Sequence, residues 1–425
     1  MREHDHYAPQ SGDVTFDVES YDLDIQYRVR TNRLQGRALI NAVAAIDTRS
    51  IALDLVGLRA ARVRVDGDPR TVMRQGPRKL RVIPPRALEA GEAFSIEVQY
   101  AGAPAPRHSR WGTIGWEELD DGALVASQPI GAPTWFPCND RPDDRARYRI
   151  AVTVDEGYAV AATGVAAPPQ RVSGRTRWEF ATDLPVATYL VAVHVGRYTR
   201  TPLGPAHLRH PPALAASVRR AFRDAPRMLS VFEEAFGPYP QDHCTIVVTP
   251  DVLEIPLEAQ GLAVFGSNHL DPDSERLIAH ELAHQWFGNS VGIAHWRDIW
   301  LNEGFACYAE WIWSEASGGP SAAALAAQHH ARLQRLPQDL LLTDPGPDRM
   351  FDDRVYKRGA LALHALRTRI GDAGFFAVLR RWAGQHRHGL VATEDFLRCV
   401  EDVTGSDPAP LLTPWLDLLP LPALR

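Results

Sequence analysis

The sequence predicts an α+β fold, with an N-terminal antiparallel β domain over residues 1–205 and a mainly helical domain over residues 206–425. The first two hundred residues alternate apolar and polar side chains in short runs separated by Gly, Pro, Asp and Asn, as strands and hairpins do. From Asp271 onward the apolar residues recur mostly at helical spacing. Between these regions the proline-rich segment TPLGPAHLRHPPALA interrupts the strand pattern. A chain of 425 residues has room for two or three domains, and we place the boundary in this segment.

The individual elements follow from local signals. The strand candidates share alternation and a high content of Val, Ile and Tyr; they include TFDVESYDLDIQYRV, FSIEVQYAG, YRIAVTVDEGYAVAATG and TRWEFATDLPVATYLVAVHVGRYTR. Apolar spacing predicts a helix from about Ala213 to Phe236, and CTIVVTP and GLAVFGS read as buried strands. Asp271 followed by proline is a helix start and Gly288 a helix end, so a helix of about four turns is predicted between them.

Composition excludes several classes of protein. The chain is 45% hydrophobic and 23% charged, which argues against a fibrous or disordered protein. The formal charge of −6 and the absence of a basic block argue against nucleic acid as a partner. Lysine occurs only at Lys79 and Lys357, which we attribute to a GC-rich genome and not to function.

The cysteines and the N-terminus indicate a reducing compartment. The cysteines are widely separated, so we expect neither a disulfide framework nor a cysteine metal site; they are Cys138, Cys244, Cys307 and Cys399. The polar start MREHDHYAPQSGD has no apolar signal-peptide core, and no run of 18 uncharged apolar residues occurs. A soluble, cytoplasmic protein with no membrane partner is therefore expected, and the sequence does not indicate its oligomeric state.

A metal-site pattern lies in LIAHELAHQWFGN, residues 277–289. His280 and His284 are four apart, so on a helix both imidazoles project from one face and can reach one tetrahedral ion. Glu281 lies beside that ion without being directed onto it, which suits a base that takes a proton from a metal-bound water. The pattern also occurs by chance in helices, so a third ligand has to decide. Glu303 in WLNEGFACYAEW, separated from His284 by 18 residues, can open a second helix and face the histidines, giving the three-ligand form of a catalytic zinc site.

These residues resemble a known family. HELAHQWFGN followed by WLNEGFA is similar to the aminopeptidase N family of gluzincin metallopeptidases, which includes leukotriene hydrolases. VTFDVESYDLDIQY, FPCNDRPDDRARYRIAV and EAFGPYP are similar to other stretches of that family, so the resemblance extends over nearly the whole chain. It implies a saddle-like β domain followed by a thermolysin-like catalytic domain. It also implies one Zn²⁺ per chain and, as substrates, peptides with a free N-terminal amine.

The resemblance carries further site residues. VYKRGALALHALR is similar to the family's tyrosine segment, which implies that Tyr356 donates its O–H to the oxyanion of the reaction. The family recognises the substrate amine with a Gly-Ala-Met-Glu-Asn loop, where this chain has IPLEAQGL, so Glu258 matches the family glutamate. Gln128 matches a second amine-binding position. Pro256, which has no N–H to offer, and Ala259 depart from the family loop and put its subsite geometry in doubt.

Other roles stay open at this level. Glu310, seven residues after Glu303, either orients a ligand histidine or is a surface glutamate. Larger family members continue into a helical C-terminal domain, which this chain is expected to lack, so we expect a more open cleft that admits longer peptides. The alternatives are an endopeptidase, an epoxide hydrolase or a leader-peptide-trimming protease with mixed endo- and aminopeptidase activity. A non-catalytic peptide-binding scaffold is the alternative of another class, although a scaffold has no need of Glu281.

Overall fold

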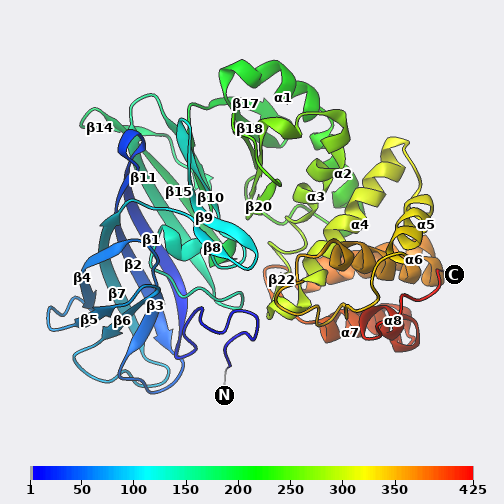
Figure 1. The fold of residues 1–425 in the computed structure, drawn as a ribbon, viewed down its shortest axis with the longest axis horizontal. Coiled ribbons are helices and arrows are strands. Elements are labelled where there is room, and N and C mark those ends of the chain that lie inside the picture. The colour runs from blue at the N-terminus through cyan, green and yellow to red at the C-terminus, as the bar shows by residue number, and fades with distance from the viewer. Residues whose placement is uncertain (1–2, 425) are drawn as a thin grey trace. The chain divides into compact units, whose positions relative to one another are not determined.

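The computed structural model describes residues 3–424, which divide into two compact units. Of the described residues, the first unit comprises 3–202, 206–216 and 242–268, and the second comprises 203–205, 217–241 and 269–424. The first is built of strands and the second mainly of helices (Figure 1), which confirms the predicted α+β class with β structure preceding helices.

The central sheet of the first unit is mixed. Its strands, in spatial order, are β13 (Val165–Ala166), β15 (Arg175–Ala187), β11 (Arg145–Asp155), β1 (Phe16–Arg28), β2 (Arg33–Ala44), β7 (Ala93–Gly102) and β4 (Arg59–Val65), with β14 (Gln170–Val172) paired to β15. Its pairs are antiparallel except β1 with β11, a parallel pair that the predicted antiparallel domain does not include. In β1 the buried positions change from even to odd numbers after Val18, because a bulge between Val18 and Ser20 shifts the register.

Smaller sheets complete this unit. One runs β3 (Ile51–Asp54), β6 (Lys79–Ile83), β5 (Val72–Gln75), and another runs β12 (Ala159–Ala162), β16 (Val193–Gly196), β10 (Gly122–Ala126), β9 (Gly112–Leu119), β8 (Arg107–Ser109). A further sheet runs β17 (Thr199–Leu203), β18 (Ala206–His210), β19 (Thr245–Val248), β21 (Leu262–Phe265), β20 (Leu257–Ala259). β19 and β21 are the strands predicted from CTIVVTP and GLAVFGS, and they pair in parallel. Strand β20 lies at the edge of its sheet.

The helices of the second unit surround α4 and α6. The helices of the chain are α1 (Ala215–Ala221), α2 (Ala225–Phe236), α3 (Glu275–Ala283), α4 (Trp300–Ser317), α5 (Ala322–Leu333), α6 (Asp353–Gln385), α7 (Thr393–Thr404) and α8 (Ala409–Leu416), and β22 (Gly292–Ile293) pairs with β23 (Leu390–Val391). Within α6 the backbone leaves helical geometry at Gly371, with φ 74°. The helices of residues 3–424 are too short or too polar to cross a membrane.

Two predicted helices have different limits in the structure. The helix expected from Ala213 to Phe236 is two helices, α1 and α2. The break lies one turn before Pro226, because proline has no N–H to bond the Phe222 carbonyl and its ring crowds that carbonyl. The helix expected from Asp271 to Gly288 begins with a 3₁₀ turn over Pro272–Ser274, and its α-helical part ends at Ala283. There the N–H groups of Gln285 and Trp286 bond three residues back, which tightens the chain out of the α-helix.

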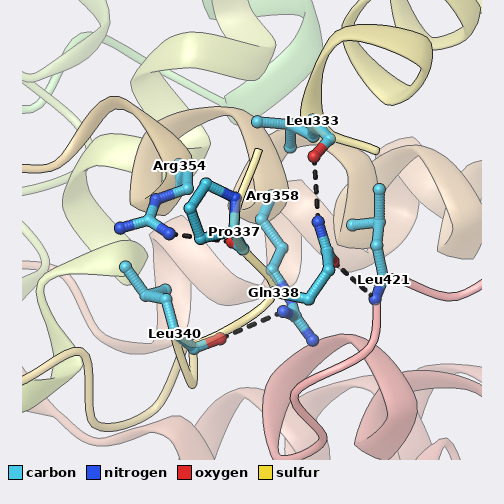
Figure 2. Close-up of a pocket in the computed structure, with 7 residues that line it drawn as sticks. All are labelled: Leu333, Pro337, Gln338, Leu340, Arg354, Arg358 and Leu421. Carbon is cyan, nitrogen blue, oxygen red and sulfur yellow. Dashed lines mark hydrogen bonds between the residues drawn. The ribbon is translucent and has the colours of Figure 1, made fainter. Parts of the chain in front are cut away.

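One buried arginine fastens the C-terminal segment to α6. The Arg358 guanidinium donates to the backbone carbonyls of Leu340, Pro414, Trp415, Leu418 and Leu419. Nearby, Gln338 accepts from the Leu421 N–H at 2.9 Å and donates to the Leu333 carbonyl, and these residues line a small pocket with Arg354 and Pro337 (Figure 2). The C-terminal segment therefore packs against α6 within the second unit.

Helices α4 and α6 touch through glycine. A Cβ added to Gly304 would lie 2.9 Å from the Cα of Gly359, and one added to Gly359 would lie 2.8 Å from the Cα of Gly304. Real Cβ atoms do not come this close to backbone, so the two helices approach each other only because neither residue has a side chain. Gly304 follows Glu303, and Gly359 lies three residues after Tyr356.

We expect Gly304→Ala to destabilise the protein by about 1–3 kcal/mol, because the added methyl group must push α4 away from α6. Gly384→Ala is the matched control: Gly384 lies within α6, and its added Cβ would meet nothing within 4 Å outside its own stretch of helix. This control should gain up to about 1 kcal/mol from helix propensity. Urea unfolding of both variants measures the difference, and equal free energies of unfolding would contradict a close helix contact.

Candidate metal centre

The two histidines of the predicted site lie at the end of α3. His280 is in its last turn and His284 is the capping residue, with the His284 N–H bonded to the His280 carbonyl. Their ring centroids are 4.7 Å apart and the rings are nearly perpendicular. Gly288, with φ 109°, turns the chain away after them. The helical spacing thus brings both imidazoles to one face, as predicted.

Glu303 comes from the first turn of α4. Its Oε2 lies 3.5 Å from His280 Nε2 and 3.4 Å from His284 Nε2, and all three residues are buried. Donor atoms bound tetrahedrally to one zinc ion at about 2.0–2.1 Å are separated from each other by about 3.3 Å. The spacing, and the combination of two imidazole nitrogens with one carboxylate, therefore fit zinc as a three-ligand catalytic site.

Both histidines are oriented through their other ring nitrogen. His280 Nδ1 lies 2.9 Å from Glu310 Oε1, and His284 Nδ1 lies 3.0 Å from the Phe287 carbonyl. These acceptors hold a proton on Nδ1 and leave the Nε2 atoms to face Glu303. Glu310 is 7% exposed, so it is not a surface glutamate.

The remaining predicted residues fall into two groups. Glu281 is buried on α3, and Tyr356 lies in the first turn of α6 with its ring centroid 6.0 Å from that of His280. Both therefore belong to the second unit, together with His280, His284 and Glu303. Glu258 and Gln128 belong to the first unit, where Glu258 lies on the edge strand β20 opposite Ala263 and Gln128 follows β10.

The loop departures have visible effects on β20. The strand begins at Leu257, because Pro256 cannot donate a hydrogen bond to a ladder. Ala259 is paired in the strand opposite Leu262, and its side chain is buried. Ala259, which stands where the family has asparagine, is therefore part of the packed interior.

Comparison with known proteins identifies the family. The Peptidase family M1 domain matches residues 220–415, and the Peptidase M1 N-terminal domain matches residues 17–190. Crystal structures of the M1 zinc metallopeptidase from Deinococcus radiodurans are 33% identical to this chain and superimpose with a TM-score of 0.88. One such structure covers 98% of this chain and 97% of its own. The chain belongs to peptidase family M1. The resemblance to aminopeptidase N is thereby confirmed, and zinc is the metal of the family.

Other M1 relatives are more distant or longer. Leucyl aminopeptidase of Saccharolobus solfataricus is 23% identical over 96% of this chain, which spans 54% of that protein. Aminopeptidase M1-A of Oryza sativa is 27% identical, and the matched part of this chain spans 36% of it. This M1 chain thus spans about half or less of the length of these curated relatives. Yeast LTA4 hydrolase, at 20% identity and a TM-score of 0.82, shares the fold.

Sequence reasoning misses three features around the M1 site: the Gly304–Gly359 contact, the salt bridge of Arg276 with Glu310, and the position of Lys357 beside Glu310. Glycine and lysine at these positions give no periodic or motif signal. The role of each of these residues depends on its contacts with another helix, and the sequence does not show those contacts.

Zinc binding to the M1 site is expected to release a proton. Burial lowers the pKa of His280, but hydrogen bonds with Glu303 and Glu310 outweigh burial and raise that pKa to about 9. Burial raises the pKa of Glu303, and the attraction of His284 together with the contacts to His280 lowers it below its ordinary value. At pH 7 the metal-free site therefore holds His280 protonated and Glu303 ionised. Zinc needs the unprotonated ring nitrogen, so its affinity should rise about tenfold per pH unit up to pH 9 and then level off.

Competition with a chelator of known proton affinity, measured from pH 6.5 to 10, tests this expectation. Glu310→Gln removes one of the two carboxylates that raise the His280 pKa. The affinity of that variant should therefore level off at a lower pH. A profile without slope between pH 7 and 9 would contradict a protonated His280.

Proposed function

We propose that this chain is a zinc-dependent aminopeptidase that hydrolyses the N-terminal peptide bond of peptides. The observation that carries the proposal is the group of His280 Nε2, His284 Nε2 and Glu303 Oε2, with 3.4 and 3.5 Å between the donor atoms. These residues would bind one zinc ion per chain. Zinc bound there supplies Lewis acidity toward a water molecule and the peptide carbonyl.

The side chains around the ligands would carry the proton and charge steps. Glu281 takes the proton of the attacking water and delivers it to the leaving amine, acting as general base and then as general acid. Tyr356 donates its O–H to the oxyanion that develops on the carbonyl. Glu310 and the Phe287 carbonyl keep the imidazoles in the orientation that the ligands need.

Recognition of a free amine is assigned to Glu258 and Gln128. The carboxylate of Glu258 would pair with the substrate α-ammonium, and the Gln128 carbonyl would accept a hydrogen bond from it. A variant of the Deinococcus protein has been solved with a Tyr-Ser-Ala substrate, and variants of a two-domain M1 zinc metallopeptidase have been solved with L-arginine and with L-tryptophan. Each of these compounds has a free α-amine, which supports cleavage from the N-terminus in this relative of those proteins.

One set of measurements tests the proposed function. Purified protein should contain about one zinc per chain and hydrolyse aminoacyl-arylamides, but not their N-acetylated forms. Cleavage of N-acetylated peptides would support the endopeptidase or leader-trimming alternative. Bound zinc without turnover of any free-amine substrate would overturn the aminopeptidase assignment and support a non-catalytic scaffold.

We also propose a domain division near residue 205, a thermolysin-like arrangement of the catalytic domain and a cytoplasmic location. The proline-rich segment around residues 201–215 and the separate family matches over residues 17–190 and 220–415 support the division. Limited proteolysis that cuts only far from this segment would argue against the boundary. Cell fractionation tests the location, and a crystal structure superimposed on thermolysin tests the arrangement.

A further inference from the structure

Glu310 uses both carboxylate oxygens. Its Oε1 faces His280 Nδ1 at 2.9 Å, and its Oε2 lies 3.5 Å from Arg276 Nη1 and 3.6 Å from Lys357 Nζ. An ionised carboxylate taken out of water needs compensating charge, or it takes up a proton and loses its strength as an acceptor. Arg276 and Lys357 therefore stabilise the ionised form of Glu310, which is the form that accepts a hydrogen bond from His280 most strongly.

The two cations differ in environment. The Arg276 side chain is 59% exposed, so solvent screens its attraction for Glu310. Lys357 is 7% exposed, and a buried charge acts in a less polar medium. Lys357 is thus the partner whose charge reaches Glu310 with the least screening.

Lys357 has a second neighbour that shows which contact carries the charge. Its Nζ lies 3.0 Å from Cys307 Sγ. Burial raises the pKa of the Cys307 thiol to about 12 even though Lys357 opposes the shift, so at neutral pH the sulfur is a neutral acceptor. The anion that Lys357 pairs with is Glu310.

The lysine also connects two helices of the site. On α4, Glu303, Cys307 and Glu310 are spaced four and three residues apart, which places them along one face. Lys357 reaches two of these positions from α6, where it directly follows Tyr356. Its contacts therefore link the helix that carries Glu303 to the helix that carries Tyr356.

We propose that Lys357 is a positioning residue, whose buried ammonium holds the Glu310 carboxylate against His280 Nδ1 and so fixes that imidazole for the metal. The inference rests on the proposed function of the zinc site. It gives a specific role to one of the only two lysines of the chain.

Zinc affinity, measured by chelator competition, is the primary readout, together with the absorption spectrum of the cobalt-substituted protein. Lys357→Met keeps the approximate length of the side chain and removes its charge. Loss of a group that supports a metal ligand from outside the ligand set costs about 10–100-fold in metal affinity, so a drop in that range is expected. Lys357→Arg should recover most of the affinity, and kcat should fall in Lys357→Met with KM nearly unchanged.

A double-variant comparison separates this role from packing. In a Glu310→Gln background there is no carboxylate to hold, so Lys357→Met should weaken zinc binding by no more than about twofold. If Lys357→Met folds poorly, the double variant should regain thermal stability, because it buries no unpaired carboxylate. Equal losses in both backgrounds would overturn the proposal in favour of packing, and wild-type zinc affinity in Lys357→Met would overturn it outright.

Lys79→Met is the matched control. Lys79 is the other lysine of the chain and forms a 2.8 Å salt bridge with buried Asp54 in the first unit. The control should lose stability but keep wild-type zinc affinity. Failure of the proposed function is recognised separately, because the wild-type protein would then lack zinc, turnover or both.

Discussion

Glu281→Gln is expected to lower kcat by about 10²–10⁴-fold, the usual contribution of general acid–base catalysis, while zinc remains bound. Glutamine has nearly the same size but cannot take up a proton. Glu281 does not belong to the group formed by His280, His284 and Glu303, so the metal content should stay at the wild-type level. Steady-state kinetics and metal analysis of the same preparation give both values.

Glu275→Gln is the control for this prediction. Glu275 opens the same helix and accepts a hydrogen bond from Trp313 Nε1, which a glutamine oxygen can also accept. Its kcat should remain within about twofold of wild type, as expected for a glutamate that carries no proton in the reaction. If Glu281→Gln retained wild-type kcat, the base would have to be another residue.

Tyr356→Phe should lower kcat by about 10²–10³-fold, the usual cost of removing one donor to a developing oxyanion. KM should change little, because the O–H contributes in the transition state and not in substrate binding. The ring of Tyr356 lies nearly parallel to that of His280, at 22°, and phenylalanine keeps this packing. Zinc content and thermal stability should therefore match the wild type.

Tyr308→Phe controls for the loss of a tyrosine hydroxyl in the same unit. The Tyr308 O–H is buried and lies 3.1 Å from His364 Nδ1. Its loss should cost about 1 kcal/mol of stability without changing kcat. A rise in KM alone for Tyr356→Phe, with kcat preserved, would exclude the oxyanion role.

Local sequence patterns predict the fold class and the approach of Glu303 to His280 and His284. The distance between His284 and Glu303 suits a helix, a return and a second helix, and the structure brings Glu303 to both histidines. Strands β19 and β21 are likewise where apolar runs predict them. These features depend on periodicity and spacing within one stretch of chain.

Other features depend on contacts that no local pattern encodes. The parallel pairing of β1 with β11 joins segments more than a hundred residues apart. The contact of Gly304 with Gly359 is visible only once two helices are packed together. The early end of α3 has a local cause that the sequence does not reveal. Two hydrogen bonds that reach only three residues back end the α-helix at Ala283, whereas Gly288 predicts a later end. The break between α1 and α2 is the exception, since Pro226, which cannot bond the carbonyl four residues earlier, marks it in the sequence.

Lysine shows how composition can mislead. The scarcity of lysine is explained by a GC-rich genome, and that explanation suffices for the near absence of lysine from the chain. Genome composition does not explain why a lysine is retained at position 357, where it is buried beside Glu310 and Cys307. A rare residue type in a polar, buried place has a physical reason that a count cannot show.

The attachment of the C-terminal segment to Arg358 has a consequence for local unfolding. Arg358 lies two residues after Tyr356 and holds the carbonyls of residues 414, 415, 418 and 419. If the end of the chain detached, a buried guanidinium would lose several acceptors at once, so the tail and the first turns of α6 should open as one cooperative segment. Amide hydrogens of α8 and of the turn around Tyr356 should then exchange with similar protection. Residues 414–419 would thereby control how often the turn that carries Tyr356 opens.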